Sequence, residues 1–331
     1  MRQQVLGRAG LASEAEVLDR VNRILGPVTV AADVSQRPLN GKVLRVVTRS
    51  GESSFVKWYR NQTDYQREWD ALTHYTPALG SDAPRLIDND EGLKMLLISE
   101  LQGEPAAGAA NEWDPLVHFK AGALVRRLHE SSQPVVSDQF ARQCATRFEE
   151  SATVVEGLVS SALLSEARLV IAQAMDLPSL TLVPAHRDNH PRNWMVDSGG
   201  HVRFIDFGMA EYDPWIVDVF FLEQDYWRTD PQLRVSAPII LLKKKDAEYD
   251  PWIVDVFFLE QDYWRTDPQL RVAFLSGYDR EMDDRDLIML KAHHAVTAVR
   301  ALATTSGPSA SKAEKSKAKD MFDSLLGMTL F

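Results

Sequence analysis

Residues 186–193, His-Arg-Asp-Asn-His-Pro-Arg-Asn, place a carboxylate and an amide at short spacing, and Asp206-Phe207-Gly208 follows them in the chain. In-line phosphoryl transfer needs a carboxylate that orients the attacking hydroxyl, and oxygen ligands for a Mg²⁺ ion that bridges the nucleotide phosphates. The pattern therefore predicts Asp188 as the base and Asn193 with Asp206 as the metal ligands. We interpret this stretch as a phosphoryl-transfer site.

The flanking segments indicate how these residues are positioned. Leu180–Val183 is typical of a short apolar strand, and Pro191 prevents a helix from running through the motif, so we expect the motif on a loop. Residues 195–205 favour two strands joined by a Gly-Gly turn, which would return Asp206 to the neighbourhood of Asn193. Two protein oxygens with nucleotide phosphates suffice for Mg²⁺, because this ion keeps several waters.

These motifs resemble those of the aminoglycoside phosphotransferase family, small-molecule kinases related in fold to protein kinases. The family's loop H-x-D-x-x-x-x-N is matched by His186, Asp188 and Asn193, and its metal-binding aspartate is matched by Asp206. The family commonly has glycine after the histidine, whereas this chain has Arg187, as protein kinases do. The resemblance covers most of the chain. It implies a bilobal, protein-kinase-like α+β fold, with His186 as structural support of the loop.

Length and composition agree with an enzyme of two lobes. The chain has 331 residues and 45% hydrophobic content, enough for two cores. Its net charge of −10 argues against a nucleic-acid surface, and either keeps the protein soluble or attracts cationic small molecules. Cys144 is the only cysteine, no signal-peptide pattern is present and no apolar run reaches about 18 residues. We expect a cytoplasmic protein without nucleic-acid or membrane partners.

The chain is expected to divide near residue 100 into a nucleotide-binding N-lobe, 1–100, and a C-lobe, 101–331, that carries the catalytic loop, metal site and substrate site. Helical spacing of apolar residues predicts a helix over 11–25. β-Branched and aromatic residues predict a small antiparallel sheet, and further spacing predicts a mainly helical C-lobe. The expected strands are 28–34, 42–49, 54–59 and 93–101, and the expected C-lobe helices are 113–130, two within 140–175, and 286–304.

Five further residues of the nucleotide site are implied by the resemblance. Lys57, on the third expected strand, matches the lysine that meets the α and β phosphates, and Glu68, on the helical stretch after it, is its best partner. Residues Ser99, Glu100 and Leu101 match the crossover whose main chain lines the nucleotide pocket. No G-x-G-x-x-G loop is present, so the phosphate loop stays unassigned. His129, which ends a core helix, is expected to be a hydrogen-bonded structural residue.

One segment is duplicated: the 26 residues 210–235 recur unchanged at 247–272. A repeat array would contain at least three copies that had drifted apart, so we interpret this as a recent tandem duplication or as an artefact of the sequence. In the family, an aspartate five residues after an Asp-Pro aspartate starts a core helix and braces the catalytic loop. Asp218 and its copy Asp255 both fit that position, with a slight preference for Asp218.

The sequence favours an ATP- or GTP-dependent kinase that phosphorylates a hydroxyl of a small molecule, with Mg²⁺ as cofactor. The acceptor could be an aminoglycoside or another antibiotic, or a sugar, amino alcohol, nucleoside or choline-like metabolite, because the fold does not fix the substrate. Acidic residues near 281–286 could receive a cationic acceptor. A nucleotide-binding regulatory protein without turnover is the alternative from a different class.

Overall fold

The structure is a computed structural model that describes residues 10–35, 41–177, 179–218 and 267–305. These residues form two compact units. Of the described residues, the first unit contains 10–35, 41–133, 183–212 and 273–279, and the second contains 134–177, 179–182, 213–218, 267–272 and 280–305. The division near residue 100 into a nucleotide-binding and a catalytic lobe stays a prediction, because these units group residues by proximity and not by role.

The first unit contains a five-stranded antiparallel sheet with the spatial order β1-β2-β3-β5-β4. The predicted strands are confirmed with small shifts at their ends. The sequence analysis missed the edge strand β4, since three of its five residues are Asp or Asn, which are rare in strands. The bounds are β1 Val28–Asp33, β2 Gly41–Thr48, β3 Ser53–Tyr59, β4 Leu86–Asp90 and β5 Met95–Ser99.

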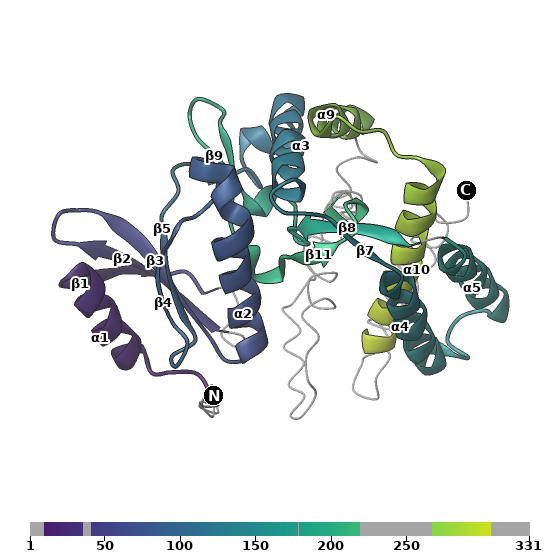
Figure 1. Ribbon diagram of the computed structural model, residues 1–331, viewed down its shortest axis with the longest axis horizontal. Helices are drawn as coiled ribbons and strands as arrows, with labels where there is room; N and C mark the ends of the chain where they lie inside the picture. Colours follow the sequence, from purple (N-terminus) through teal and green to yellow (C-terminus); the bar gives the residue numbers. More distant parts are fainter. Residues whose placement is uncertain (1–9, 36–40, 178, 219–266, 306–331) are drawn as a thin grey trace. The chain divides into compact units, whose positions relative to one another are not determined.

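Helix α1, Glu14–Leu25, covers one face of this sheet (Figure 1). It starts at a capping box in which Ser13 and Glu16 satisfy each other's backbone N–H groups. Its buried Val17 and Val21 pack in one cluster with Trp58 of β3. The indole N–H of Trp58 also donates to the carbonyl of Ala12 at 3.0 Å, which ties the entry of the helix to the sheet.

Helix α2, Gln62–Asp70, covers the opposite face of the sheet, as Figure 1 shows. Its Tyr65 packs in a second cluster with Ile98 of β5. Successive side chains of a strand point to opposite faces, so Trp58 faces α1 whereas its neighbours Lys57 and Tyr59 face α2. The alternation in β3 therefore decides that Lys57 meets α2.

A short hairpin follows the catalytic motif. Strand β9, Trp194–Val196, pairs antiparallel with β10, Val202–Phe204, and the two-residue β6, Glu104–Pro105, extends the sheet. Gly103 permits this close approach: it has φ of 115°, and a Cβ atom there would lie 2.8 Å from the main chain of Val196. The predicted hairpin is confirmed, with its turn at residues 197–201.

Helix α3, Pro115–His129, lies against the later part of α9, Pro268–Tyr278, through two glycines. A Cβ at Gly122 would lie 2.0 Å from the carbonyl oxygen of Phe274, and one at Gly277 would lie 1.9 Å from that of Phe119. Only glycine allows these backbones to approach so closely. Nδ1 of the buried His129 lies 2.8 Å from the Tyr278 hydroxyl, so the structural reading of this histidine is confirmed.

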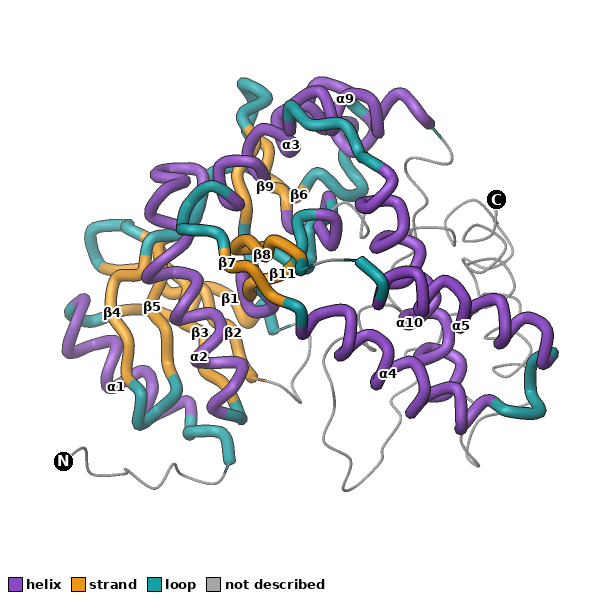
Figure 2. Tube along the Cα trace, turned by 45° about the vertical axis from the view of Figure 1, so that its right-hand side comes forward, coloured by secondary structure: helices purple, strands orange, loops and turns teal. Residues whose placement is uncertain are grey.

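The second unit is built from three helices that lie side by side in Figures 1 and 2: α4, Gln139–Val155; α5, Ser161–Met175; and α10, Asp284–Thr305. Each was predicted. Their buried faces include Phe148, Leu164 and Val299. Strand β7, Val135–Ser137, pairs antiparallel with the start of β8, Leu180–Ala185. No helix within the described ranges is both long and apolar enough to cross a membrane.

The described part of the first duplicated copy is packed in a core. Strand β11, Glu211–Asp213, precedes a turn in which Trp215, Ile216 and Val217 are buried. The indole N–H of Trp215 donates to Asp286 Oδ1 at 2.8 Å. Asp218 is completely buried at the end of this turn. Residues 219–266, which hold most of the second copy and its Asp255, lie outside the described residues.

Candidate active site

Lys57 joins two of the predicted acidic residues. Its ammonium nitrogen lies 2.7 Å from Oε1 of Glu68 on α2 and 2.9 Å from Oδ1 of Asp206. The Glu68 side chain is only 2% exposed and that of Lys57 is 12% exposed, whereas the Asp206 side chain is 51% exposed. One carboxylate is therefore a buried partner of the lysine, and the other faces solvent.

The two carboxylates keep Lys57 charged. Burial lowers the pKa of Lys57, but the negative charges of Asp206 and Glu68 outweigh burial and raise that pKa above its ordinary value. In return, the charge of Lys57 lowers the pKa of Asp206, although partial desolvation and the negative charge of Asp188 oppose the effect. At neutral pH this region thus holds an ammonium group and ionised carboxylates.

His186 fixes the start of the catalytic loop directly after β8. It is buried, and its Nε2 lies 3.0 Å from the carbonyl oxygen of Ile205. A carbonyl oxygen can only accept, so Nε2 must carry the hydrogen. The imidazole also packs edge-on against Phe204, with ring centroids 5.7 Å apart, and lies 4.7 Å from the Phe207 ring. These contacts tie the loop to the strand that leads into Asp206.

Asp188 is held from two sides. Its Oδ2 accepts from the amide Nδ2 of Asn193 at 2.7 Å, and its Oδ1 lies 2.9 Å from Nε2 of His190, which is 4% exposed. Burial raises the pKa of Asp188, but the electrostatic attraction and hydrogen bond of His190 outweigh it and hold that pKa well below its usual range. Asp188 is therefore an ionised carboxylate of fixed orientation that can accept a hydrogen bond from a hydroxyl.

Asn193 and Asp206 are brought together by the hairpin. The main-chain N–H of Ile205, beside Asp206, donates to the carbonyl of Asn193 at 3.0 Å. Asp206 itself has φ 64° and ψ 68°, a left-handed conformation that is uncommon outside glycine. A Cβ at Gly208 would lie 3.4 Å from Glu68 Oε2, so the glycine leaves room for α2 beside this turn.

The donor set fits a hard cation that retains other ligands. In Asn193, the amide nitrogen donates to the side chain and carbonyl of Asp188, so the amide oxygen is the atom that could bind a cation. The second site residue, Asp206, supplies a half-exposed carboxylate. Within the described ranges no three His, Cys, Asp or Glu side chains gather as a metal cluster. Two protein oxygens suit Mg²⁺ completed by phosphate and water, and do not suit Zn²⁺.

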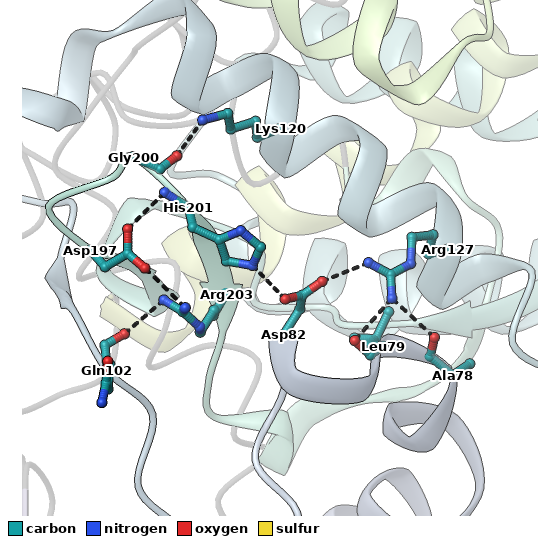
Figure 3. Close-up of polar contacts among 10 residues, drawn as sticks. All are labelled: Ala78, Leu79, Asp82, Gln102, Lys120, Arg127, Asp197, Gly200, His201 and Arg203. Atoms are coloured by element: carbon teal, nitrogen blue, oxygen red, sulfur yellow. Dashed lines mark hydrogen bonds and ion pairs between the residues drawn. The ribbon is translucent and has the colours of Figure 1, made fainter.

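The far end of the hairpin is anchored by the polar network of Figure 3. Asp82 accepts from Arg127 of α3 at 2.6 Å and lies 2.6 Å from Nε2 of His201. Arg203 of β10 donates to the carbonyl of Gln102 at 3.1 Å and to Asp197 at 2.9 Å. The hairpin that ends at Asp206 is therefore fixed to α3 and to the crossover after β5.

At this crossover, the three predicted nucleotide-lining residues are adjacent but differ in their contacts. Ser99 closes the sheet, since its N–H donates to the carbonyl of Arg85 at 2.9 Å. Glu100 accepts from Arg45 of β2 through both carboxylate oxygens, at 2.7 and 2.9 Å. Leu101 directly follows Glu100 in the chain. The crossover is thus fastened to the sheet by side chains.

Several contacts near the site involve residues to which the sequence analysis gave no role in it. Tyr59 donates to Glu68, His190 contacts Asp188, and Glu211 accepts from Arg187 while its Oε2 also lies 3.8 Å from Arg67. Tyr59 could have been found from its place two residues after Lys57 on the same strand face. The Arg187–Glu211 pair had no local signal, because 24 positions separate the two residues.

Among the predicted acidic residues near 281–286, Asp286 is already paired: it accepts from Arg280 at 2.9 Å, in addition to its bond with Trp215. It is 9% exposed and serves the core of its own unit. Asp283 accepts from the backbone N–H of Asp286 at 2.8 Å and so caps the start of α10. These two acids have structural uses.

Several solved structures share this fold over nearly the whole chain. The macrolide 2'-phosphotransferase MphH from Brachybacterium faecium superposes with a TM-score of 0.56 at 15% identity, over 93% of this chain and 97% of that chain. An amicoumacin kinase, solved with AMP-PNP and Ca²⁺, gives 0.57 at 18% identity over 96% and 94%. A choline kinase from Cryptosporidium parvum Iowa II gives 0.55 at 14% identity over 95% of each chain. No curated protein sequence matches the chain.

The sequence model of the Phosphotransferase enzyme family, APH, matches residues 36–240, and the chain belongs to this family. It is a phosphotransferase of the kind that acts on hydroxyl groups of small molecules. The predicted protein-kinase-like α+β fold and the predicted family are both confirmed.

Proposed function

We propose that this protein transfers the γ-phosphate of ATP or GTP to a hydroxyl group of a small molecule. The observation that carries the proposal is the pairing of Lys57 with Asp206 in the same unit as the Asp188–Asn193 pair. A lysine held between two carboxylates can receive phosphate oxygens, and an ionised, oriented carboxylate can receive the acceptor hydroxyl.

In this proposal Asp188 orients the acceptor hydroxyl and accepts its proton as the phosphoryl group leaves the nucleotide. Asn193 and Asp206 would hold Mg²⁺, which when bound neutralises charge on the nucleotide phosphates. Lys57 contacts the phosphates, and Glu68 keeps Lys57 in place. Asn193 and His190 hold the Asp188 carboxylate in one orientation, so it can align the acceptor hydroxyl before it accepts the proton.

The remaining predicted residues support the site. His186 holds the catalytic loop to the strand before Asp206. Asp218, or its copy Asp255, is proposed to brace that loop. The complete burial of Asp218, the last described residue of the first copy, supports Asp218. Main-chain groups of Glu100 and Leu101 are proposed to meet the nucleotide base, with Ser99 beside them. For Ser99 the contact would be through its carbonyl or side chain, because its N–H is used by Arg85.

The acceptor is proposed to be a hydroxylated small molecule, with an aminoglycoside or other antibiotic as the first candidate. Solved structures of the same fold include enzymes named for macrolides, spectinomycin and choline. A sugar, amino alcohol, nucleoside or choline-like acceptor is the second candidate. A cationic acceptor would suit the net charge of −10. A single cysteine, Cys144, buried at 3% exposure, supports our proposal of a reducing cytoplasm.

A regulatory protein that binds nucleotide without turnover is the alternative. The duplication directly after Asp206-Phe207-Gly208 favours it, since an insertion there disturbs the part of the chain that follows the metal site. Against it stand the four intact residues Lys57, Asp188, Asn193 and Asp206, which a protein without turnover would not need to retain together.

Nucleotide consumption distinguishes the two functions. Purified protein is given MgATP or MgGTP with a panel of hydroxylated antibiotics and metabolites, and phosphorylated product is detected by mass spectrometry. We expect product with at least one acceptor and none without acceptor beyond slow hydrolysis. Tight Mg-nucleotide binding without product across the panel would favour the regulatory protein.

A further inference from the structure

The carboxylate of Glu68 has two donors. Its Oε1 accepts from Lys57 at 2.7 Å, and its Oε2 accepts from the hydroxyl of Tyr59. Glu68 is 2% exposed, so each of these bonds replaces a water molecule that the carboxylate has lost. Nothing in the catalytic motifs assigns a role to Tyr59.

The position of Tyr59 follows from strand geometry. It is two residues after Lys57 on β3, and residues so spaced share a face of the sheet, here the face covered by α2. The Tyr59 ring packs edge-on against Tyr65 of α2, with centroids 6.4 Å apart. The strand and the helix together hold the phenol beside Glu68.

The hydrogen bond has a defined direction. Burial, followed by the charge of Glu68, raises the pKa of Tyr59 well above its ordinary value, so the phenol keeps its hydrogen at neutral pH. The phenol O–H therefore donates to Oε2 of Glu68. The bond fixes the rotation of the carboxylate about its last side-chain bond, which one donor alone would leave free.

Lys57 depends on this fixed carboxylate. Its other partner, Asp206, is the proposed metal ligand and is half exposed, so its carboxylate is expected to turn toward a bound metal ion. Glu68 then remains as the buried anchor of the ammonium group. We infer that Tyr59 is a positioning residue for nucleotide binding, which holds Glu68 so that Lys57 meets the nucleotide phosphates. This inference rests on the proposed function of the same site.

The test compares two tyrosines that differ in their partner. Tyr59→Phe removes the hydroxyl that binds Glu68, whereas Tyr65→Phe removes one that lies 2.9 Å from Asn89 Nδ2, away from Lys57. Affinity is measured by displacement of a fluorescent nucleotide, with MgATP, MgGTP and the nucleosides adenosine and guanosine as competitors. Because Tyr59→Phe loses one charge-assisted hydrogen bond, we expect the affinity for the preferred Mg-nucleotide to fall by about tenfold.

Nucleosides lack the phosphates that Lys57 is proposed to contact. Their affinity therefore distinguishes a loss of Lys57 positioning from general damage to the nucleotide site. We expect Tyr59→Phe to leave nucleoside affinity unchanged and Tyr65→Phe to change neither affinity. Equal weakening of nucleoside and nucleotide, or Mg-nucleotide affinity within about twofold of the wild type, would overturn the inference.

A second comparison, made in the Glu68→Gln variant, tests the inference even if Tyr59→Phe alone is unstable. Glu68→Gln removes the charge that Tyr59 satisfies, so adding Tyr59→Phe to it should produce no further loss of Mg-nucleotide affinity. A further tenfold loss would contradict a role through Glu68. These are binding measurements, so a protein that never transfers phosphate could still confirm the role of Tyr59, and an active kinase could still refute it.

Discussion

The ammonium nitrogen of Lys57 lies 2.9 Å from Oδ1 of Asp206, although 149 positions separate the two residues in the chain. Lys57 comes from the middle strand of the sheet, and Asp206 follows the hairpin β9–β10. Glu68 completes this group from α2. Three segments thus meet at one ammonium group beside the Asp188–Asn193 pair.

Asp188→Asn should separate catalysis from nucleotide binding. The amide has nearly the same shape but does not accept a proton from the acceptor, so we expect kcat to fall by about 10²- to 10⁴-fold. Affinity for Mg-nucleotide should stay near that of the wild type, because Asp188 acts on the acceptor. Steady-state kinetics with the best acceptor from the panel, together with a binding isotherm, measure both. Unchanged kcat would remove Asp188 from its proposed role.

Glu211 should stabilise the protein through Arg187. The Arg187 side chain is 6% exposed and its φ is 63°, while the Glu211 side chain is 54% exposed. We expect Glu211→Gln to cost about 1 kcal/mol in urea unfolding, a modest value because the acid is half exposed. In an Arg187→Gly background, where glycine suits the positive φ, the same substitution should cost almost nothing. Equal costs in both backgrounds would show that the two residues are not coupled.

Asp82 should give a pH-dependent contribution to stability. Burial raises its pKa, but the bonds from His201 and Arg127 outweigh burial and lower that pKa below the ordinary value of 3.8. A carboxyl with a depressed folded-state pKa stabilises the fold above the unfolded pKa, and the contribution is lost as pH falls through the folded pKa.

Asp82→Asn should therefore lower the free energy of unfolding by about 1–2 kcal/mol at pH 7, since its partners are about half exposed. This difference in free energy of unfolding between wild type and variant should persist down to about pH 4 and become smaller below pH 4. Urea unfolding at several pH values measures this. Asp19→Asn is the matched control, because its ion pair with Arg23 is 69% and 65% exposed and should contribute little. A deficit that grows on acidification would contradict the prediction.

Deletion of residues 210–246 should raise the melting temperature. The deletion removes one copy and the spacer, and Met209 is then followed by the identical sequence that starts at Ala247. If the extra residues were looped out, closing the loop would cost roughly 3 kcal/mol by the logarithmic rule, and a surplus apolar segment would favour aggregation. Differential scanning calorimetry should show a rise of several °C, at about 2–4 °C per kcal/mol for a large domain. A lower melting temperature would show that both copies stabilise the fold.

The sequence by itself determined the elements of the catalytic motif. Asp188 and Asn193 are five positions apart, so a loop stopped by Pro191 brings them together without help from distant residues. The hairpin that returns Asp206 was also readable, because its strands and turn are local. The helices α1, α3, α4, α5 and α10 followed from the spacing of apolar side chains, which local geometry turns into one buried face.

Only the tertiary structure decided the contacts between distant segments. The burial of Tyr59 against Glu68, the bond of His190 to Asp188 and the pairing of Arg187 with Glu211 depend on rotamers and on how α2, the catalytic loop and β11 pack. The edge strand β4 escaped prediction because pairing with β5 compensates for its poor strand composition. Local spacing fixes which residues can face one another along an element, whereas contacts across elements are set by the packing of the whole unit.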